Sequence, residues 1–179
     1  GMINGGFKRV LLCCGEGNQA YCREDKSTYP LFGSAGTCTA LEYDESAPEV
    51  KMHLASDGNG WKAIYAPDGG FRNPPNAKSC IICEYDEGVR RSRLNAWLDG
   101  MDVFAFGISQ PPKSIKALCQ HFSINVCDVD ALLLHQANLF LNAKIAKKVG
   151  MPLDKCPHNI EEFGNSSSAT VPTTIAYCG

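Results

Sequence analysis

Hydrophobic residues recur with helical spacing most clearly near the end of the chain. Leu141, Ile145 and Val149 form one stripe within residues 138–149, and a glycine, Gly150, follows the last of them. Three lysines occupy the opposite face: Lys144, Lys147 and Lys148. This pattern predicts an amphipathic α-helix over residues 138–149 with Gly150 as its terminating residue.

A second helix is predicted over residues 114–122, where apolar residues again repeat at helical spacing. Pro111 and Pro112 precede this segment and are expected at the start of the helix. Between the two helices, the short apolar run at residues 131–134 predicts a buried strand. Helix, strand and helix in succession favour an α/β layered fold.

The first half of the chain predicts strands. Residues 7–14 are almost continuously apolar between glycines, which is typical of a strand buried on both faces. Because a domain rarely begins inside its core, we expect covering strands upstream of this sequence. Residues 35–43 and 50–55 predict a strand pair joined by an acidic turn. Residues 15–30 and 57–75 predict loops, the longer one being functional or a crossover between two halves.

Composition narrows the class of protein. The chain has 179 residues, of which 44% are hydrophobic and 20% charged, so disorder and a coiled coil are excluded. A net charge of -2 predicts no general affinity for nucleic acid or for anionic lipid. The sequence contains neither an apolar run long enough to cross a bilayer nor a signal-peptide pattern, so we expect a cytoplasmic protein.

Ten cysteines are present, and most are expected to be reduced packing residues. Five of them lie within or beside apolar segments: Cys13, Cys14, Cys38, Cys119 and Cys127. Cys80 and Cys83 have the spacing of a metal or redox pair, but no second pair accompanies them. We therefore expect no metal site and no cofactor.

Residues 15–20 match the pattern G-x-G-x-x-A after a predicted strand, and Glu42 follows at the spacing of a dinucleotide fingerprint. Residues 18–30 have no apolar periodicity, so no helix N-terminus is expected there to hold a pyrophosphate. A plain glycine-rich turn is the better interpretation.

Two polar motifs lie at the starts of predicted helices. His135, in HQAN at residues 135–138, follows a predicted buried strand, where a histidine points into the ligand crevice of an α/β fold. Its alternative roles are to cap the helix or to lie satisfied in the core. Asn165 lies in the small polar run GNSSSAT at residues 164–170 and is either a ligand-directed donor or a helix N-cap.

Together, these two motifs resemble the C-terminal half of β-ketoacyl-acyl-carrier-protein synthase III, a thiolase-fold condensing enzyme. The resemblance extends over nearly the whole chain, including residues 6–14, residues 29–42 and residues 100–106. It implies an incomplete thiolase-like layered α/β fold. Residues 2–99 are then the end of the N-terminal half with a long connecting loop, and residues 100–179 are most of the C-terminal half.

The resemblance implies an acyltransferase of fatty acid biosynthesis, in which a malonyl thioester loses carbon dioxide and the resulting enolate attacks an enzyme-bound acyl group. His135 and Asn165 would donate hydrogen bonds to the malonyl thioester carbonyl, and one such donor is typically worth about 3 to 4 kcal/mol of barrier. Residues expected to contact the substrate are Asn138, Phe140, Lys147 and Lys148. Acyl carrier protein or coenzyme A thioesters and a second copy of the chain are the implied partners.

The sequence departs from the family pattern at several positions. None of the ten cysteines stands where the family has its nucleophile, so we expect this chain alone to be inactive in condensation. Ser34 replaces an aspartate of the family, and Phe140 replaces a frequent arginine. The alternatives are a non-catalytic thioester-binding or scaffold subunit and, for the lysines, a merely solvated helix face.

Overall fold

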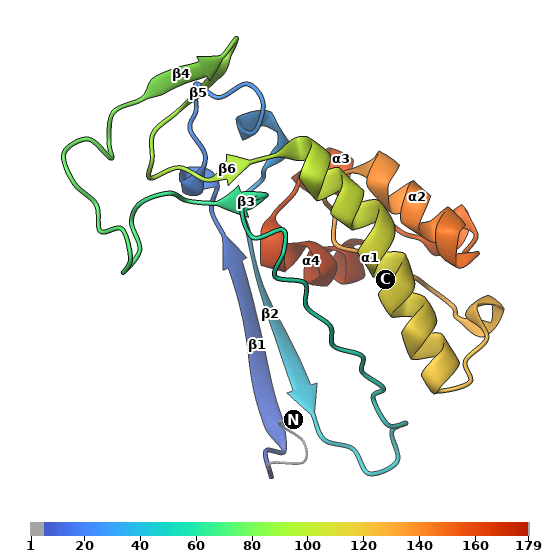
Figure 1. Ribbon diagram of the computed structural model, residues 1–179. Coiled ribbons are helices and arrows are strands. Elements are labelled where there is room, and N and C mark those ends of the chain that lie inside the picture. The colour runs from blue at the N-terminus through green and yellow to red at the C-terminus, as the bar shows by residue number, and fades with distance from the viewer. Residues whose placement is uncertain (1–5, 179) are drawn as a thin grey trace.

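The computed structural model describes residues 6–178, apart from the side chain of Asn18. The α-helices are α1 (Gly100–His121), α2 (Leu139–Val149), α3 (Ile160–Phe163) and α4 (Thr170–Cys178). The strands are β1 (Arg9–Glu16), β2 (Ala35–Glu42), β3 (Ile64–Tyr65), β4 (Cys83–Asp86), β5 (Val89–Arg91) and β6 (Trp97–Leu98). Figure 1 shows the helices gathered on one side and a two-stranded arm projecting away from them.

The projecting arm is the antiparallel pair of β1 and β2, with Arg9 opposite Glu42 and Glu16 opposite Ala35. Both strands were predicted, but the predicted pairing of the second one with residues 50–55 was wrong, since that segment has no regular secondary structure. The predicted burial of the first strand on both faces was also wrong, because Leu11 is 68% exposed. An apolar run identifies a strand but not its partner or its cover.

The long helix α1 begins earlier than predicted. Asp99 caps it by accepting hydrogen bonds from the amides of Met101 and Asp102, both at 3.0 Å. Pro111 and Pro112 therefore lie inside the helix and not at its start, which corrects the prediction.

A proline inside a helix leaves the carbonyl four residues earlier without its usual backbone donor. Pro112 has no N–H for the carbonyl of Ile108, four residues earlier. Lys148, on the neighbouring helix α2, donates from Nζ to this Ile108 oxygen at 2.7 Å. The contact replaces the missing hydrogen bond and ties α1 to α2.

The helix α2 agrees with its prediction. Leu141, Ile145 and Val149 are buried. Asn138 caps the first turn, its Oδ1 accepting from the amide of Leu141 at 2.7 Å. Gly150 ends the helix with a positive φ of 85°, a conformation that favours glycine. The small core continues from this helix through Ala146, Val149 and Met151, against which Ile115, Val126, Val129 and Leu132 pack.

The segment at residues 131–134 is extended but is not a strand, so that prediction was wrong. Its Leu132 amide donates to the carbonyl of Lys155 at 2.8 Å, and the segment pairs with no strand among residues 6–178. A strand exists only where a second strand completes its hydrogen bonds. The extended segment nevertheless leads directly to His135.

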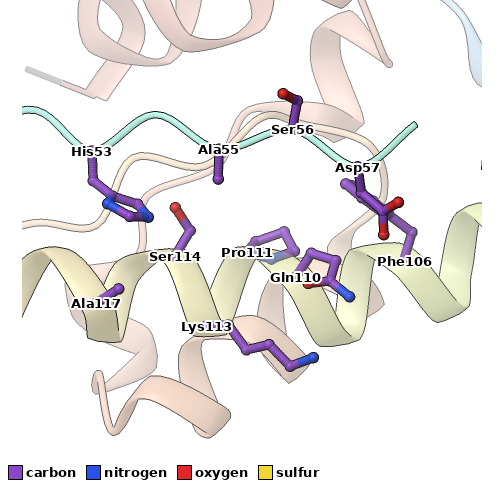
Figure 2. A pocket seen from close by; sticks show the side chains of 10 residues that line it. All are labelled: His53, Ala55, Ser56, Asp57, Phe106, Gln110, Pro111, Lys113, Ser114 and Ala117. Carbon is purple, nitrogen blue, oxygen red and sulfur yellow. The ribbon is translucent and has the colours of Figure 1, made fainter. Parts of the chain in front are cut away.

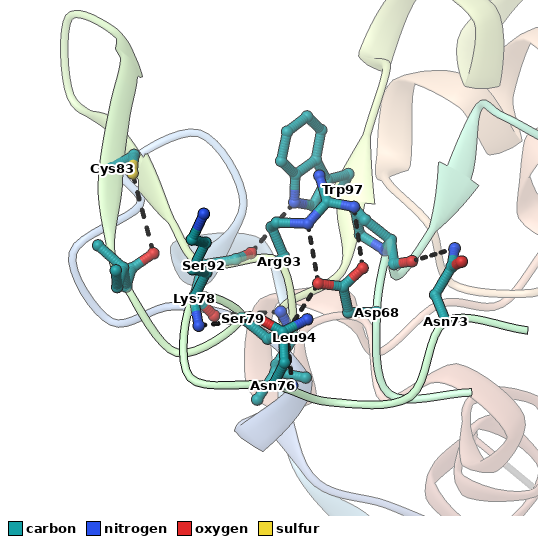
Figure 3. A network of polar contacts seen from close by, with 12 residues as sticks. Asp68, Asn73, Asn76, Lys78, Ser79, Cys83, Ser92, Arg93, Leu94 and Trp97 are labelled. Atoms are coloured by element: carbon teal, nitrogen blue, oxygen red, sulfur yellow. Dashed lines mark hydrogen bonds and ion pairs between the residues drawn. The ribbon is translucent and has the colours of Figure 1, made fainter. Parts of the chain in front are cut away.

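Residues 57–75 were expected to be a loop and are mostly irregular, although β3 lies within them and pairs with β6. Polar contacts hold this connection in place (Figure 3). Asp68 accepts two hydrogen bonds from Arg93 at 2.8 Å each, and a third from the Ser79 hydroxyl at 2.7 Å. These hydrogen bonds lower the pKa of Asp68, that from Arg93 most.

The cysteines are all free, but they are not the core thiols that were expected. Of the five singled out in the sequence, Cys13, Cys38 and Cys127 are exposed, while Cys14 and Cys119 are half-buried. Only Cys22 is buried. The correction has the same cause as that for β1, since the apolar segments that carry these thiols are largely uncovered in this chain.

Candidate functional site

His135 lies between the extended segment and the N-terminus of α2. Its ring is anchored at Nδ1, which lies 2.7 Å from the hydroxyl oxygen of Thr170, the first residue of α4. The residue keeps an exposed surface. Packing against the ring still lowers its pKa, although the backbone of Ser167 opposes this shift. A lowered pKa makes the ring predominantly neutral at pH 7.

Asn165 is held through its backbone by residues from the first half of the chain. Its amide donates to the carbonyl of Leu31, and its carbonyl accepts from the amide of Gly33, both at 3.0 Å. Gly33 is required here because a Cβ at this position would lie 1.9 Å from the carbonyl oxygen of Phe163. Gly164, just before the asparagine, has a positive φ of 62° that a glycine tolerates best.

A hydrogen-bonded path connects the two candidate residues. The Oδ1 of Asn165 accepts from the amide of Ser167 at 3.0 Å. The Ser167 carbonyl in turn accepts from the Thr170 hydroxyl at 2.8 Å, and that hydroxyl contacts His135. Ser167 has a positive φ of 50°, a strained conformation for a residue with a side chain. The turn that carries Ser167 therefore brings the imidazole and the carboxamide to opposite ends of one network.

The path also shows which polar atoms remain available. Because Oδ1 of Asn165 accepts a backbone hydrogen bond, the orientation of the amide is set and Nδ2 is the donor that remains on this side chain. No residue within 6–178 accepts a hydrogen bond from Nδ2. On His135, Nε2 is the ring nitrogen that does not contact Thr170. Nε2 of His135 and Nδ2 of Asn165 belong to residues that lie 30 positions apart in sequence.

The residues expected to bind substrate are placed at different points along α2. Asn138 is the helix cap, so its side chain is engaged by the backbone. Phe140 stacks on Phe104 with ring centroids 5.8 Å apart. Lys147 lines a hollow of about 430 Å³ together with Phe140, whereas Lys148 points to α1 and does not line it. The hollow is completed by Ala143, Lys144, Met151, Pro152 and Leu153.

Another hollow, of about 380 Å³, lies between residues 53–57 and α1 (Figure 2). His53 and Asp57 face it from the irregular segment at residues 53–57, and Phe106 and Ser114 face it from α1. It contains neither His135 nor Asn165.

The other sequence motifs lack the geometry of cofactor sites. Residues 18–20 form a single 3-10 turn, so no helix follows the G-x-G-x-x-A motif. Cys80 and Cys83 are exposed and free. No group of three or more His, Cys, Asp or Glu residues suited to a metal ion occurs among the described residues. In the same part of the chain, none of the helices is both long and apolar enough to span a membrane.

Sequence reasoning missed Thr170, Ser167 and Gly33 as parts of the site. The first two lie inside the polar run that was singled out, but nothing in that run indicates which side chain meets the imidazole. Gly33 and Phe163 are distant in sequence and become neighbours only when the chain folds. A glycine beside an aromatic residue in an apolar segment was the only available signal.

Comparisons with known proteins identify relatives of this arrangement. A family model described as the C-terminal part of 3-oxoacyl-[acyl-carrier-protein (ACP)] synthase III matches residues 119–178. A β-ketoacyl-[acyl-carrier-protein] synthase III of Streptococcus pneumoniae (strain Hungary19A-6) is 33% identical over 178 residues. These residues are 99% of this chain and 52% of the relative.

Solved structures give the same result. A 3-oxoacyl-(acyl-carrier-protein) synthase III superposes with a TM-score of 0.89 at 28% identity, covering 97% of this chain and 52% of that one. A 3-oxoacyl-(acyl-carrier protein) synthase from Burkholderia xenovorans LB400 superposes with a TM-score of 0.77 at 34% identity, covering 96% and 48%. The chain thus spans about half the length of the relatives it matches.

The sequence resemblance, the mixed α/β fold and the position of the matched residues agree with one another. The fold is thiolase-like and incomplete, because it covers about half of the chains it superposes on. This chain is therefore related to the β-ketoacyl-acyl-carrier-protein synthase III family of condensing enzymes and corresponds to the C-terminal portion of its members.

Proposed function

We propose that this chain contributes the enolate-forming part of a decarboxylative condensing site, in which an acyl thioester reacts with a malonyl thioester. His135 and Asn165 bind the malonyl thioester carbonyl. The negative charge that develops on its oxygen as carbon dioxide leaves is stabilised by hydrogen bonds directed at it.

The observation that carries the proposal is the hydrogen-bonded path from His135 through Thr170 and Ser167 to Asn165. The path holds His135 by Nδ1 and Asn165 by Oδ1. Nε2 of His135 and Nδ2 of Asn165 then remain to bind a ligand. Groups held in place before the substrate arrives stabilise charge without reorganising.

The substrate arm is proposed to lie along α2. Phe140 and Lys147 line one hollow, which offers an apolar wall and a cation to a thioester carrier. Carriers of this chemistry are acyl carrier protein or coenzyme A, both rich in negative charge. Lys148 is less suited to this role, because its ammonium group already donates to the Ile108 carbonyl.

We further propose that residues 1–179 alone do not complete the condensation. An acyl-accepting cysteine is activated at a helix N-terminus or beside a cation. None of the ten cysteines lies in the first turn of an α-helix of the described chain. The expected activity is therefore confined to binding a malonyl thioester and polarising its carbonyl.

Calorimetric titration of malonyl-coenzyme A into the 179-residue protein tests this function. His135→Ala and Asn165→Ala should each weaken binding by roughly three- to tenfold, the value of one hydrogen bond. His158→Ala is the matched control, since His158 is an exposed histidine paired with Glu161. Equal affinities for the wild type and all three variants would contradict the proposal.

The second candidate is a non-catalytic thioester-binding or scaffold subunit that pairs with a cysteine-bearing chain. The exposed apolar side chains of the β1–β2 arm favour a partner, among them Leu11, Leu12 and Leu41. A second copy of the chain would serve equally, as the expected homodimer. Co-purification of a cysteine-bearing partner would support the subunit, and self-association alone would support the dimer.

The division into residues 2–99 and 100–179 is kept as part of the proposal. Its boundary coincides with Asp99, which caps α1, and its residues 2–5 and 179 lie outside the described part of the chain. The cytoplasmic location expected from the sequence stays a prediction.

A further inference from the structure

Two cysteines face each other across the β1–β2 arm, which projects away from the helices (Figure 1). Cys13 on β1 and Cys38 on β2 are direct partners in the strand register, and their Sγ atoms lie 3.6 Å apart. Both thiols are free and exposed. A disulfide bond is about 2.05 Å long, so the two sulfurs need to approach each other by roughly 1.5 Å to form one.

The hydrogen bonds of the strand pair show that the backbone spacing suits such a bond. The Tyr43 amide donates to the Lys8 carbonyl at 2.8 Å, which makes these two residues a hydrogen-bonded pair. Hydrogen-bonded and non-hydrogen-bonded pairs alternate along an antiparallel ladder. Counting along the register from Lys8 and Tyr43, Cys13 and Cys38 are a non-hydrogen-bonded pair. The Cα atoms of such pairs lie about 4.5 Å apart, within the range of about 4.4 to 6.8 Å that disulfides span.

One flank of the thiol pair is open to a reagent. Successive side chains of a strand point to opposite faces, so the next residues on the face of Cys13 and Cys38 are Gly15 and Gly36. A Cβ at either glycine would meet nothing within 4 Å. Thiol–disulfide exchange depends on access to the attacking sulfur. The two glycines leave that access open beside both thiols.

We propose that Cys13 and Cys38 are a redox modification site, which a small organic disulfide such as oxidised glutathione converts into a disulfide bond between β1 and β2. The thiolate of one cysteine attacks the reagent, forms a mixed disulfide and releases one organic thiolate. The thiolate of the other cysteine attacks the protein sulfur of this mixed disulfide, forms the interstrand bond and releases the second organic thiolate. The two cysteine protons pass through solvent to the released thiolates, so the chain loses two electrons and the reagent gains them.

The bond closes a loop of residues 13–38 that supports the candidate site. Leu31 and Gly33 lie within this loop, and both hydrogen-bond to the backbone of Asn165. A cross-link across a loop restricts the unfolded chain and thereby stabilises the folded one. Exposed disulfides are the readily reduced ones, so the bond is expected to be reversible. Oxidation should therefore reversibly stabilise the arm and the segment that holds Asn165.

Mass spectrometry of the 179-residue protein after incubation with oxidised glutathione tests this inference. Tryptic digestion without reductant places Cys13 in residues 10–23 and Cys38 in residues 27–51, and these two peptides should be joined. An equal mixture of unlabelled and nitrogen-15-labelled protein should give joined peptides of matching label only, because the bond forms within one chain.

Cysteine variants identify the sulfurs that are joined. Cys13→Ser and Cys38→Ser should each lose the joined peptides and carry glutathione on the remaining cysteine. Cys14→Ser is the matched control and should keep the joined peptides, because Cys14 points to the other face of β1 and lies opposite Thr37. The urea midpoint of the wild type should rise on oxidation, and that of Cys38→Ser should not.

Several results would overturn the inference. A wild type that gains only glutathione adducts and no joined peptides does so whether or not the variants fold. Joined peptides that persist in Cys13→Ser would assign the bond to Cys14 or Cys22. Joined peptides of mixed label would place the bond between chains. An unchanged urea midpoint of the oxidised wild type would contradict the stabilisation of the arm.

Discussion

The candidate site is held together by close contacts between backbone segments, and these contacts require particular residues, such as glycine, at single positions. Asn165 is fixed because Gly33 lets two chain segments approach, and a Cβ at position 33 would lie 1.9 Å from the Phe163 carbonyl oxygen. The end of α2 at Gly150 was predicted from the sequence, since it follows from the local pattern of this helix. The role of Gly33 was not, since it depends on a segment 130 residues away.

Replacing Gly33 with alanine should destabilise the protein and displace Asn165. Relieving a contact with rigid backbone costs about 1 to 3 kcal/mol of the free energy of unfolding, as overpacking does. Gly36→Ala is the matched control in the same segment, because a Cβ there meets nothing within 4 Å. Urea denaturation measures both. A cost for Gly33→Ala no larger than that for Gly36→Ala would show that the close approach is not required.

At the scale of elements, local patterns were predictive and pairings were not. The stripe of α2 and its termination at Gly150 were predicted correctly, because both follow from neighbouring residues on one helix. The prolines of α1 were misplaced, since the hydrogen bond that lets the helix continue past Pro112 comes from Lys148 on another element. The segment 131–134 has the sequence of a strand but lacks the neighbour that would make it one.

The Lys148 contact predicts a difference between two adjacent lysines. Lys148→Met should lower the free energy of unfolding by about 1 kcal/mol, because a charge-assisted hydrogen bond to a helix carbonyl is lost. Lys147→Met should change it by less than about 0.5 kcal/mol, as exposed substitutions do. Amide exchange around Gly107 in α1 should quicken in the first variant only. Indistinguishable stabilities would remove the contact from the account.

The connection at residues 57–75 should respond to acid through Asp68. Hydrogen bonding from Arg93 lowers the pKa of this carboxyl below its ordinary value of 3.8. The folded state therefore binds this proton less readily than the unfolded chain, and stability is lost as the pH falls from that value through the lowered pKa. Asp68→Asn should be less stable than the wild type at neutral pH, and the difference should shrink in acid. A difference independent of pH would contradict this.

Many large apolar side chains of the described residues are exposed, in every part of the molecule. Leu11 on β1 is 68% exposed, and Leu54 in the irregular segment at residues 50–57 is 90% exposed. The sequence pattern predicted that the strand carrying Leu11 is buried, which holds only where a further layer covers that strand. Two short motifs in the sequence were enough to predict the family. The exposure of the apolar strand faces could not be predicted, because the burial of a residue depends on all of its neighbours in space.

The exposed arm predicts self-association of the 179-residue protein. Unpaired strand edges and apolar faces favour pairing between copies. Sedimentation velocity should show concentration-dependent assembly that Leu11→Lys reduces. Leu153→Lys is the control, because this leucine is 63% exposed but lies next to α2, in another part of the fold. A strictly monomeric wild type at high concentration would be inconsistent with this prediction.

The proposed function depends on two side chains, those of His135 and Asn165, binding one carbonyl. Titrating malonyl-coenzyme A into isotopically labelled protein tests this most directly, with the side-chain amide of Asn165 and the ring of His135 observed by NMR. Both sets of signals should shift together and saturate at the same ligand concentration. Signal shifts confined to one of the two residues, or to residues that line the hollow around His53 (Figure 2), would contradict a shared carbonyl site.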